Sequence, residues 1–84
     1  MFYWVYAILS EKDGRIYVGM TKNVNERVEQ HNAGKSKSTK GYRPWKLFYS
    51  EKIGDGAAAR EREKYLKSGS GKEFLKSLLR NQAP

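Results

Sequence analysis

Five polar side chains in this sequence have types and spacings that could carry out chemistry on an anion. Tyr6 and Tyr17 lie in two apolar stretches that could pair as neighbouring strands. Arg27 and His31 are four residues apart, so on a helix they would share one face. Glu63 would lie at the margin of a helical apolar stripe, where its carboxylate is partly shielded from water. If folding gathers them, these groups could bind an anion and transfer a proton.

The charge balance indicates the class of partner. The 84-residue chain has 17 Lys and Arg against 9 Asp and Glu, a formal net charge of +8. Such an excess favours a polyanionic partner, and nucleic acid is the commonest one. The basic residues do not follow one face of a long amphipathic helix, which argues against a membrane surface. A basic protein without any such partner would have the same composition.

A basic loop is the most concentrated part of this charge. Residues 34–46 (GKSKSTKGYRPWK) have five basic side chains and no acidic one. The loop could hold a nucleic-acid backbone, giving salt-dependent affinity without reading base sequence, or it could be a solvated connection. Its basic residues are Lys35, Lys37, Lys40, Arg43 and Lys46.

Composition and length exclude several other classes. The chain has no cysteine, which rules out disulfides, thiolate zinc sites and a cysteine nucleophile. No run of 18 apolar residues is present, and the aromatic start FYWVYAIL resembles a buried strand more than a secretory signal. We therefore expect one domain over 1–84 with a modest core, a cytoplasmic location and no membrane partner.

The elements that must position the five side chains follow from periodicity and caps. Strands are predicted over 2–9, 15–19 and 45–51, the first of them interior because it is apolar on both faces. Helices are predicted over about 24–33, 57–67 and 71–80. Asn23, Asp55 and Ser70 are the expected N-caps, with Gly34 ending the first helix. The order β-β-α-β-α-α predicts an α+β fold, a three-stranded antiparallel sheet flanked by helices.

The length of the first hairpin loop decides whether the two tyrosines can share a site. An even-numbered loop around Asp13-Gly14 projects Tyr6 and Tyr17 from the same face, and an odd one from opposite faces. A four-residue loop pairs Tyr17 with Ile8, leaving Tyr6 diagonal to Tyr17 at roughly 7–8 Å between Cα atoms. A two-residue loop would separate them further. On the later helix, periodicity does not choose between Glu63 and Glu61.

The order of these residues resembles the GIY-YIG nuclease superfamily over nearly the whole chain. WVY at 4–6 stands where that family has Gly-Ile-Tyr, and YVG at 17–19 stands for its Tyr-Ile-Gly. Ten residues, 7–16, separate the two tyrosines, a spacing typical of the family. Arg27 matches the family's catalytic arginine, and REKYLK at 62–67 resembles its Arg-Glu-x-x-Ile-Lys element. The resemblance implies the GIY-YIG fold.

The stretch STKGYRPWKLFY at 38–49 also looks like small stand-alone bacterial members, which are related to the nuclease domain found in bacterial excinuclease ABC. The resemblance therefore implies an endonuclease that hydrolyses phosphodiester bonds, DNA more than RNA, with a place in DNA repair. Because no recognition domain fits in 84 residues, we expect little sequence preference and targeting by nucleic-acid shape or a partner protein.

The resemblance also implies a role for each of the five residues. Tyr6 is the favoured general base, and Tyr17 orients the phosphate or the water. Arg27 would hold phosphate oxygens bidentately, and His31 would accept the proton onward. Glu63 would hold one divalent cation, Mg²⁺ or Mn²⁺. Two alternatives stay open: a non-catalytic nucleic-acid-binding module, and an adaptor whose basic surface meets an acidic protein.

Overall fold

The computed structural model describes residues 2–82 and confirms the predicted order and class. The strands are β1 (Tyr3–Ser10), β2 (Ile16–Thr21) and β3 (Trp45–Gly54), and the helices are α1 (Val24–Asn32), α2 (Gly56–Lys67) and α3 (Gly69–Gln82). A short 3₁₀ helix, η1 (Lys40–Tyr42), lies in the basic loop. None of the helices within 2–82 has the length and apolar character needed to span a membrane.

The three strands form one antiparallel sheet in the order β2-β1-β3, so β1 is interior, as predicted. In the first hairpin Ile8 pairs with Tyr17 and Tyr6 pairs with Gly19. This is the register of the four-residue loop. Because side chains alternate along a strand and paired residues share a face, Tyr6 and Tyr17 project from the same face of the sheet.

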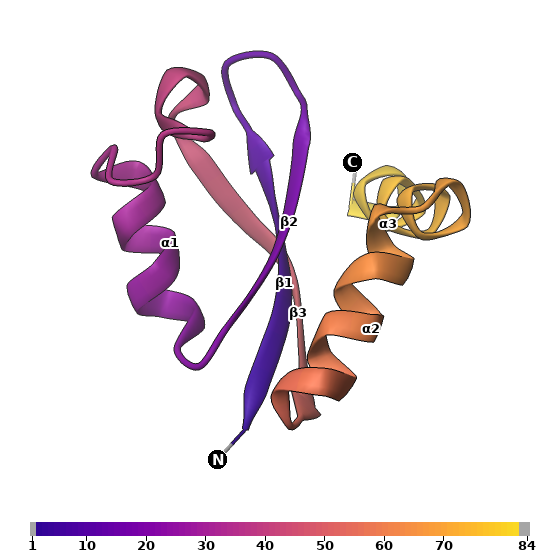
Figure 1. Ribbon diagram of the computed structural model, residues 1–84. Coiled ribbons are helices and arrows are strands. Elements are labelled where there is room, and N and C mark those ends of the chain that lie inside the picture. The colour runs from indigo at the N-terminus through magenta and orange to yellow at the C-terminus, as the bar shows by residue number, and fades with distance from the viewer. Residues whose placement is uncertain (1, 83–84) are drawn as a thin grey trace.

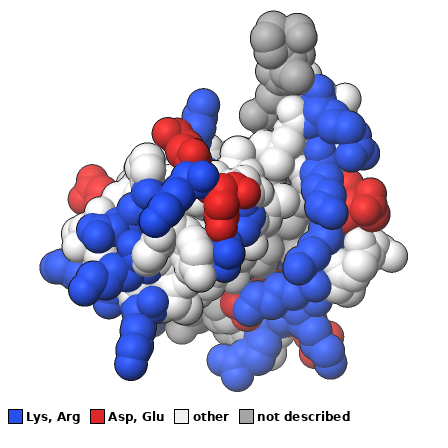
Figure 2. Space-filling model, turned by 90° about the horizontal axis from the view of Figure 1, so that it is seen from above, with Lys and Arg blue, Asp and Glu red and all other residues white. Residues whose placement is uncertain are grey.

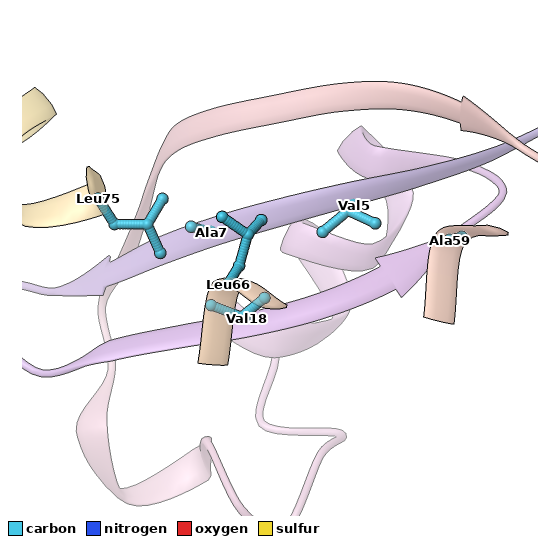
Figure 3. Packing of buried hydrophobic residues seen from close by; sticks show 6 residues of the cluster. All are labelled: Val5, Ala7, Val18, Ala59, Leu66 and Leu75. Atoms are coloured by element: carbon cyan, nitrogen blue, oxygen red, sulfur yellow. The ribbon is translucent and has the colours of Figure 1, made fainter. Parts of the chain in front are cut away.

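The sheet has a core on both faces, and β1 contributes to each. Figure 1 shows α1 on one side of the sheet and α2 with α3 on the other. Val5 and Ala7 are fully buried against the α2 and α3 side, where Leu66 and Leu75 complete the apolar cluster (Figure 3). Tyr6, Ile8 and Trp45 form a second cluster on the α1 side. The two tyrosines therefore lie on the α1 face.

Most helix ends follow the predicted caps, and one does not. The Asn23 and Asp55 side chains accept hydrogen bonds from the backbone N–H groups of Glu26 and Ala58, at 3.0 and 2.9 Å. The prediction that α3 begins after Ser70 was wrong. The Ser68 hydroxyl accepts a hydrogen bond from the Gly71 N–H, and α3 begins at residue 69. Two cap-forming serines flank one glycine, and the earlier one occupies the helix start.

Candidate active site

Tyr6 is at the centre of the predicted site. Its side chain projects from β1 and is 1% exposed. The ring crosses over Gly19 on the edge strand β2, and a Cβ placed on Gly19 would lie 2.6 Å from the phenol oxygen. A glycine at this register position therefore lets the phenol reach the sheet edge. Sequence reasoning assigned Gly19 no role of its own, although a glycine inside a strand signals a close approach.

His31 and Tyr17 surround the Tyr6 phenol. His31 lies at the end of α1, is fully buried, and its Nε2 atom is 2.8 Å from the Tyr6 oxygen. The Tyr17 ring centre lies 5.1 Å from that of His31 and 6.5 Å from that of Tyr6. The structure thus brings three of the five predicted side chains into one contact cluster.

The other imidazole nitrogen contacts a residue that sequence reasoning missed. His31 Nδ1 is 2.8 Å from the Thr39 hydroxyl, and Thr39 is also fully buried. The Trp45 indole N–H donates to the Thr39 carbonyl at 2.8 Å, and the Asn32 side-chain amide bonds both the N–H and the C=O of Trp45. The basic loop is therefore anchored from below to the end of α1. Nothing in its charge pattern indicated this.

Burial sets the protonation of the phenol and the imidazole. Desolvation raises the pKa of Tyr6 to about 12, aided by the phenol of Tyr17 and the carboxylate of Glu63, while Arg27 lowers it only in part. Desolvation, with the nearby charge of Arg27, also lowers the pKa of His31 to about 4. Both side chains are therefore neutral at neutral pH. Arg27 was expected to stabilise a phenolate, and its effect has that sign but is outweighed by burial.

Arg27 is placed beside both of these groups, because its charge acts on the pKa of each. The side chain is half-buried, and its Nη1 donates to the Gln30 side chain at 3.0 Å. Arg27 also lines a small cleft of about 170 Å³ that includes Lys22 and the N-cap Asn23. A guanidinium held this way is suited to binding an anion next to the phenol.

Glu63 reaches the site from α2. That helix contacts the edge strand β2, and the Glu63 charge is close enough to raise the pKa of Tyr6. Its side chain is 20% exposed and pairs with Lys67 at 3.3 Å, whereas Glu61 is exposed. The structure therefore favours Glu63 over Glu61 as the carboxylate that faces the site.

The donor set suits one hard cation. In the described part of the chain, no three His, Cys, Asp or Glu side chains come together, so Glu63 would be the protein ligand and water and substrate oxygens would supply the rest. Mg²⁺ is commonly bound in this way, through one or two carboxylates and phosphate oxygens.

The predicted basic loop presents its charges to solvent. Figure 2 shows Lys and Arg gathered in two groups, one on the side of α1 and the loop and one along α3. The five loop residues are exposed: Lys35, Lys37, Lys40, Arg43 and Lys46. The α3 group, which sequence reasoning missed, has Lys72, Lys76 and Arg80 at successive intervals of four, a spacing that places them on one helical face.

Comparison with known proteins identifies the family. The model of the GIY-YIG catalytic domain matches residues 2–76. The chain belongs to the GIY-YIG family. A UPF0213 protein of Staphylococcus haemolyticus is 40% identical over 77 residues, 90% of this chain and 93% of that protein. A UPF0213 protein of Syntrophus aciditrophicus is 36% identical over 80 residues, 93% and 91% of the two chains.

A solved structure extends the match to the fold. The solution NMR structure of a UPF0213 protein from Bacillus halodurans has a TM-score of 0.55 and 34% identity, covering 93% of this chain and 85% of that one. Within this GIY-YIG chain, the tyrosine of WVY at 4–6 and the tyrosine and glycine of YVG at 17–19 are the residues that meet at the sheet edge. Trp4, in place of the family's first glycine, is half-buried and leaves this meeting intact.

The buried His31 predicts a specific acid sensitivity of folding. Its pKa is about 4 in the folded protein against an ordinary 6.5, so between these values the unfolded chain binds more protons and stability falls as the pH is lowered. The shift corresponds to roughly 2–3 kcal/mol between pH 7 and pH 4. Urea unfolding should show that the stability difference between the wild type and His31→Gln narrows by this amount. An equal difference at both pH values would contradict a neutral, desolvated His31, the chain's single histidine.

Proposed function

We propose that this protein is a metal-dependent nuclease that hydrolyses phosphodiester bonds in nucleic acid, DNA in preference to RNA, with little sequence specificity. The observation that carries the proposal is the buried Tyr6–His31 hydrogen bond at the sheet edge, in a chain of the GIY-YIG family. A phenol with a direct proton acceptor, beside a guanidinium and a carboxylate, matches the needs of phosphodiester hydrolysis.

The two neutral groups support a coupled proton transfer. A phenol with a pKa near 12 does not ionise spontaneously onto an imidazole whose pKa is near 4. We therefore infer that Tyr6 passes its proton to His31 Nε2 as it takes one from the attacking water. The water oxygen bonds to phosphorus, the ester P–O bond breaks, and the proton of the water is replaced on Tyr6 by that route. The leaving oxygen takes its proton from solvent.

The remaining residues position the substrate and stabilise its charge. Arg27 would bind two phosphate oxygens at once, a geometry that a lysine ammonium cannot reproduce. Tyr17, in contact with the His31 ring, would orient the phosphate or the water. Glu63 would hold one Mg²⁺ or Mn²⁺, which when bound supplies Lewis-acid stabilisation of the phosphate charge.

The exposed basic loop would hold the nucleic-acid backbone. Because such contacts exchange for salt ions, affinity should fall steeply as ionic strength rises and should depend little on base sequence. The chain is anchored below the loop by Thr39 and Trp45, so the charges extend from a fixed support. Targeting would then depend on nucleic-acid shape or on a partner protein.

One observation favours the alternative of a non-catalytic nucleic-acid-binding module. The resting phenol and imidazole are both neutral, so the structure contains no ionised base before a substrate arrives. A GIY-YIG chain that has kept its charge but lost turnover would look the same in this respect. Binding and cleavage must therefore be measured separately.

The test is a cleavage assay on branched, flapped, single-stranded and duplex DNA and on the matching RNAs, with Mg²⁺, with Mn²⁺ and with EDTA. We expect DNA cleavage that requires the divalent ion and is lost in a folded Tyr6→Phe variant, which keeps the ring but has no proton to transfer. Salt-sensitive binding without cleavage of any substrate would establish the binding module instead. Failure of both would point to the adaptor with an acidic protein partner.

A further inference from the structure

A continuous chain of hydrogen bonds runs from the Tyr6 phenol into the basic loop. The Tyr6 oxygen lies 2.8 Å from His31 Nε2, and His31 Nδ1 lies 2.8 Å from the Thr39 hydroxyl. The Thr39 hydroxyl in turn donates to the carbonyl of Ser36 at 3.4 Å. Tyr6, His31 and Thr39 are each at most 1% exposed. The protons of this chain must therefore be shared among these partners.

Counting acceptors fixes the direction of the chain. If Thr39 donated to Nδ1, then Nε2 would be protonated and would donate to Tyr6, and the buried phenol proton would need a further acceptor. Within residues 2–82, His31 is the acceptor that the Tyr6 hydroxyl reaches, so no second one takes that proton. In the opposite direction each proton has one: Tyr6 donates to Nε2, Nδ1–H donates to Thr39, and Thr39 donates to Ser36. Buried polar hydrogens strongly favour the satisfied arrangement.

We propose that Thr39 is a positioning residue that holds His31 as its Nδ1–H tautomer, so that Nε2 is free to accept the Tyr6 proton. This rests on the proposed function, because it specifies how the proton acceptor of that reaction is prepared. In histidines generally, the hydrogen bond made by one ring nitrogen decides which nitrogen carries the proton. Thr39 makes that bond from the loop rather than from a carboxylate, which leaves the imidazole neutral.

The surroundings of Thr39 explain how a loop residue can do this. Its own carbonyl accepts the Trp45 indole N–H, and the Asn32 side chain, next to His31, bonds the Trp45 backbone on both sides. The Lys40 carbonyl accepts the Arg43 guanidinium at 2.8 Å. The stretch STKGYRPW at 38–45 therefore has a structural purpose beyond its charge, which is to fix the Thr39 hydroxyl against the imidazole.

The direct test is the tautomer of His31 by ¹⁵N NMR of histidine-labelled protein, which has a single histidine and needs no nucleic acid. At neutral pH the wild type should show a protonated Nδ1 and an unprotonated Nε2. Thr39→Val, which keeps the shape and removes the acceptor, should shift protonation toward Nε2, and Thr39→Ser should restore the wild-type pattern. A wild type with Nε2 protonated, or a Thr39→Val protein with an unchanged tautomer, would overturn the proposal. If Thr39→Val does not fold, the wild-type and Thr39→Ser spectra still decide it.

Cleavage kinetics then connect the tautomer to turnover. Thr39→Val should lower kcat on the order of tenfold, below the 10²–10⁴ typical of a positioned acid-base group, with KM unchanged. Thr39→Ser should recover kcat, and Ser38→Ala, which removes an exposed hydroxyl from the same loop, should match the wild type. A Thr39→Val protein with altered tautomer and full kcat would refute the positioning role. Absence of cleavage in the wild type would refute the proposed function while leaving the tautomer result to be judged by itself.

Discussion

A Glu63→Gln protein is expected to bind DNA as tightly as the wild type and to cleave it on the order of 10³-fold more slowly. The amide has the shape of the carboxylate but lacks the charge that a hard divalent cation requires. The stabilisation that a metal ion gives to phosphate charge in the transition state is several kcal/mol, which corresponds to a loss of this size. Cleavage rate at saturating DNA, with Mg²⁺ and with Mn²⁺, is the measurement.

Glu61→Gln is the matched control, because it removes the same charge two residues away from an exposed position of the same helix. It should cut DNA at the wild-type rate. Folding should be little affected in either variant, since the Glu63–Lys67 pair is an i,i+4 contact worth only a few tenths of a kcal/mol. Titration with Mn²⁺ provides a readout separate from turnover: Glu63→Gln should bind the ion more weakly. Equal cleavage by the two variants would show that the metal is held elsewhere.

Much of the fold was predictable because the relevant signals are local. The apolar run of β1 on both faces indicated a central strand, and the Asn23 and Asp55 caps form as expected. Where two local signals compete, sequence reasoning fails by a few residues. Ser68 and Ser70 are both suitable caps, and packing rather than propensity selects Ser68, since Gly71 lies against the backbone of Leu66.

The site was less predictable, because it depends on burial that spacing does not report. Parity of the hairpin loop gave the shared face of Tyr6 and Tyr17, and the helix repeat gave the shared face of Arg27 and His31. The pKa of Tyr6 could not follow from these patterns, since desolvation exceeds the effect of Arg27. Thr39 was also out of reach, because a loop hydroxyl reaches His31 only through long-range contacts that carry no periodic signal.

Gly19→Ala should lower both stability and activity, although glycine in a strand is ordinarily a weakness. Replacing a strand glycine with alanine typically gains about 0.5–1 kcal/mol. Here the new Cβ would lie 2.6 Å from the Tyr6 oxygen and 2.8 Å from its Cζ, and the ring is buried against His31 and Tyr17. We therefore expect a loss of about 1–3 kcal/mol from overpacking. Because the shifted phenol would lose its bond to His31, cleavage should fall by roughly 10²-fold or more.

A double-mutant cycle with Tyr6→Phe separates this clash from a general effect of the substitution. Phenylalanine lacks the oxygen that the Cβ would meet first, so Tyr6→Phe should cost less stability in the Gly19→Ala background than in the wild type. Gly69→Ala is the control, because a Cβ there has no neighbour within 4 Å and the residue lies in helical backbone, where alanine is favoured. Urea unfolding of the four proteins of the cycle measures the coupling. Additive stabilities would mean that the phenol does not lie over Gly19, and the site would then lack the geometry on which the proton transfer to His31 depends.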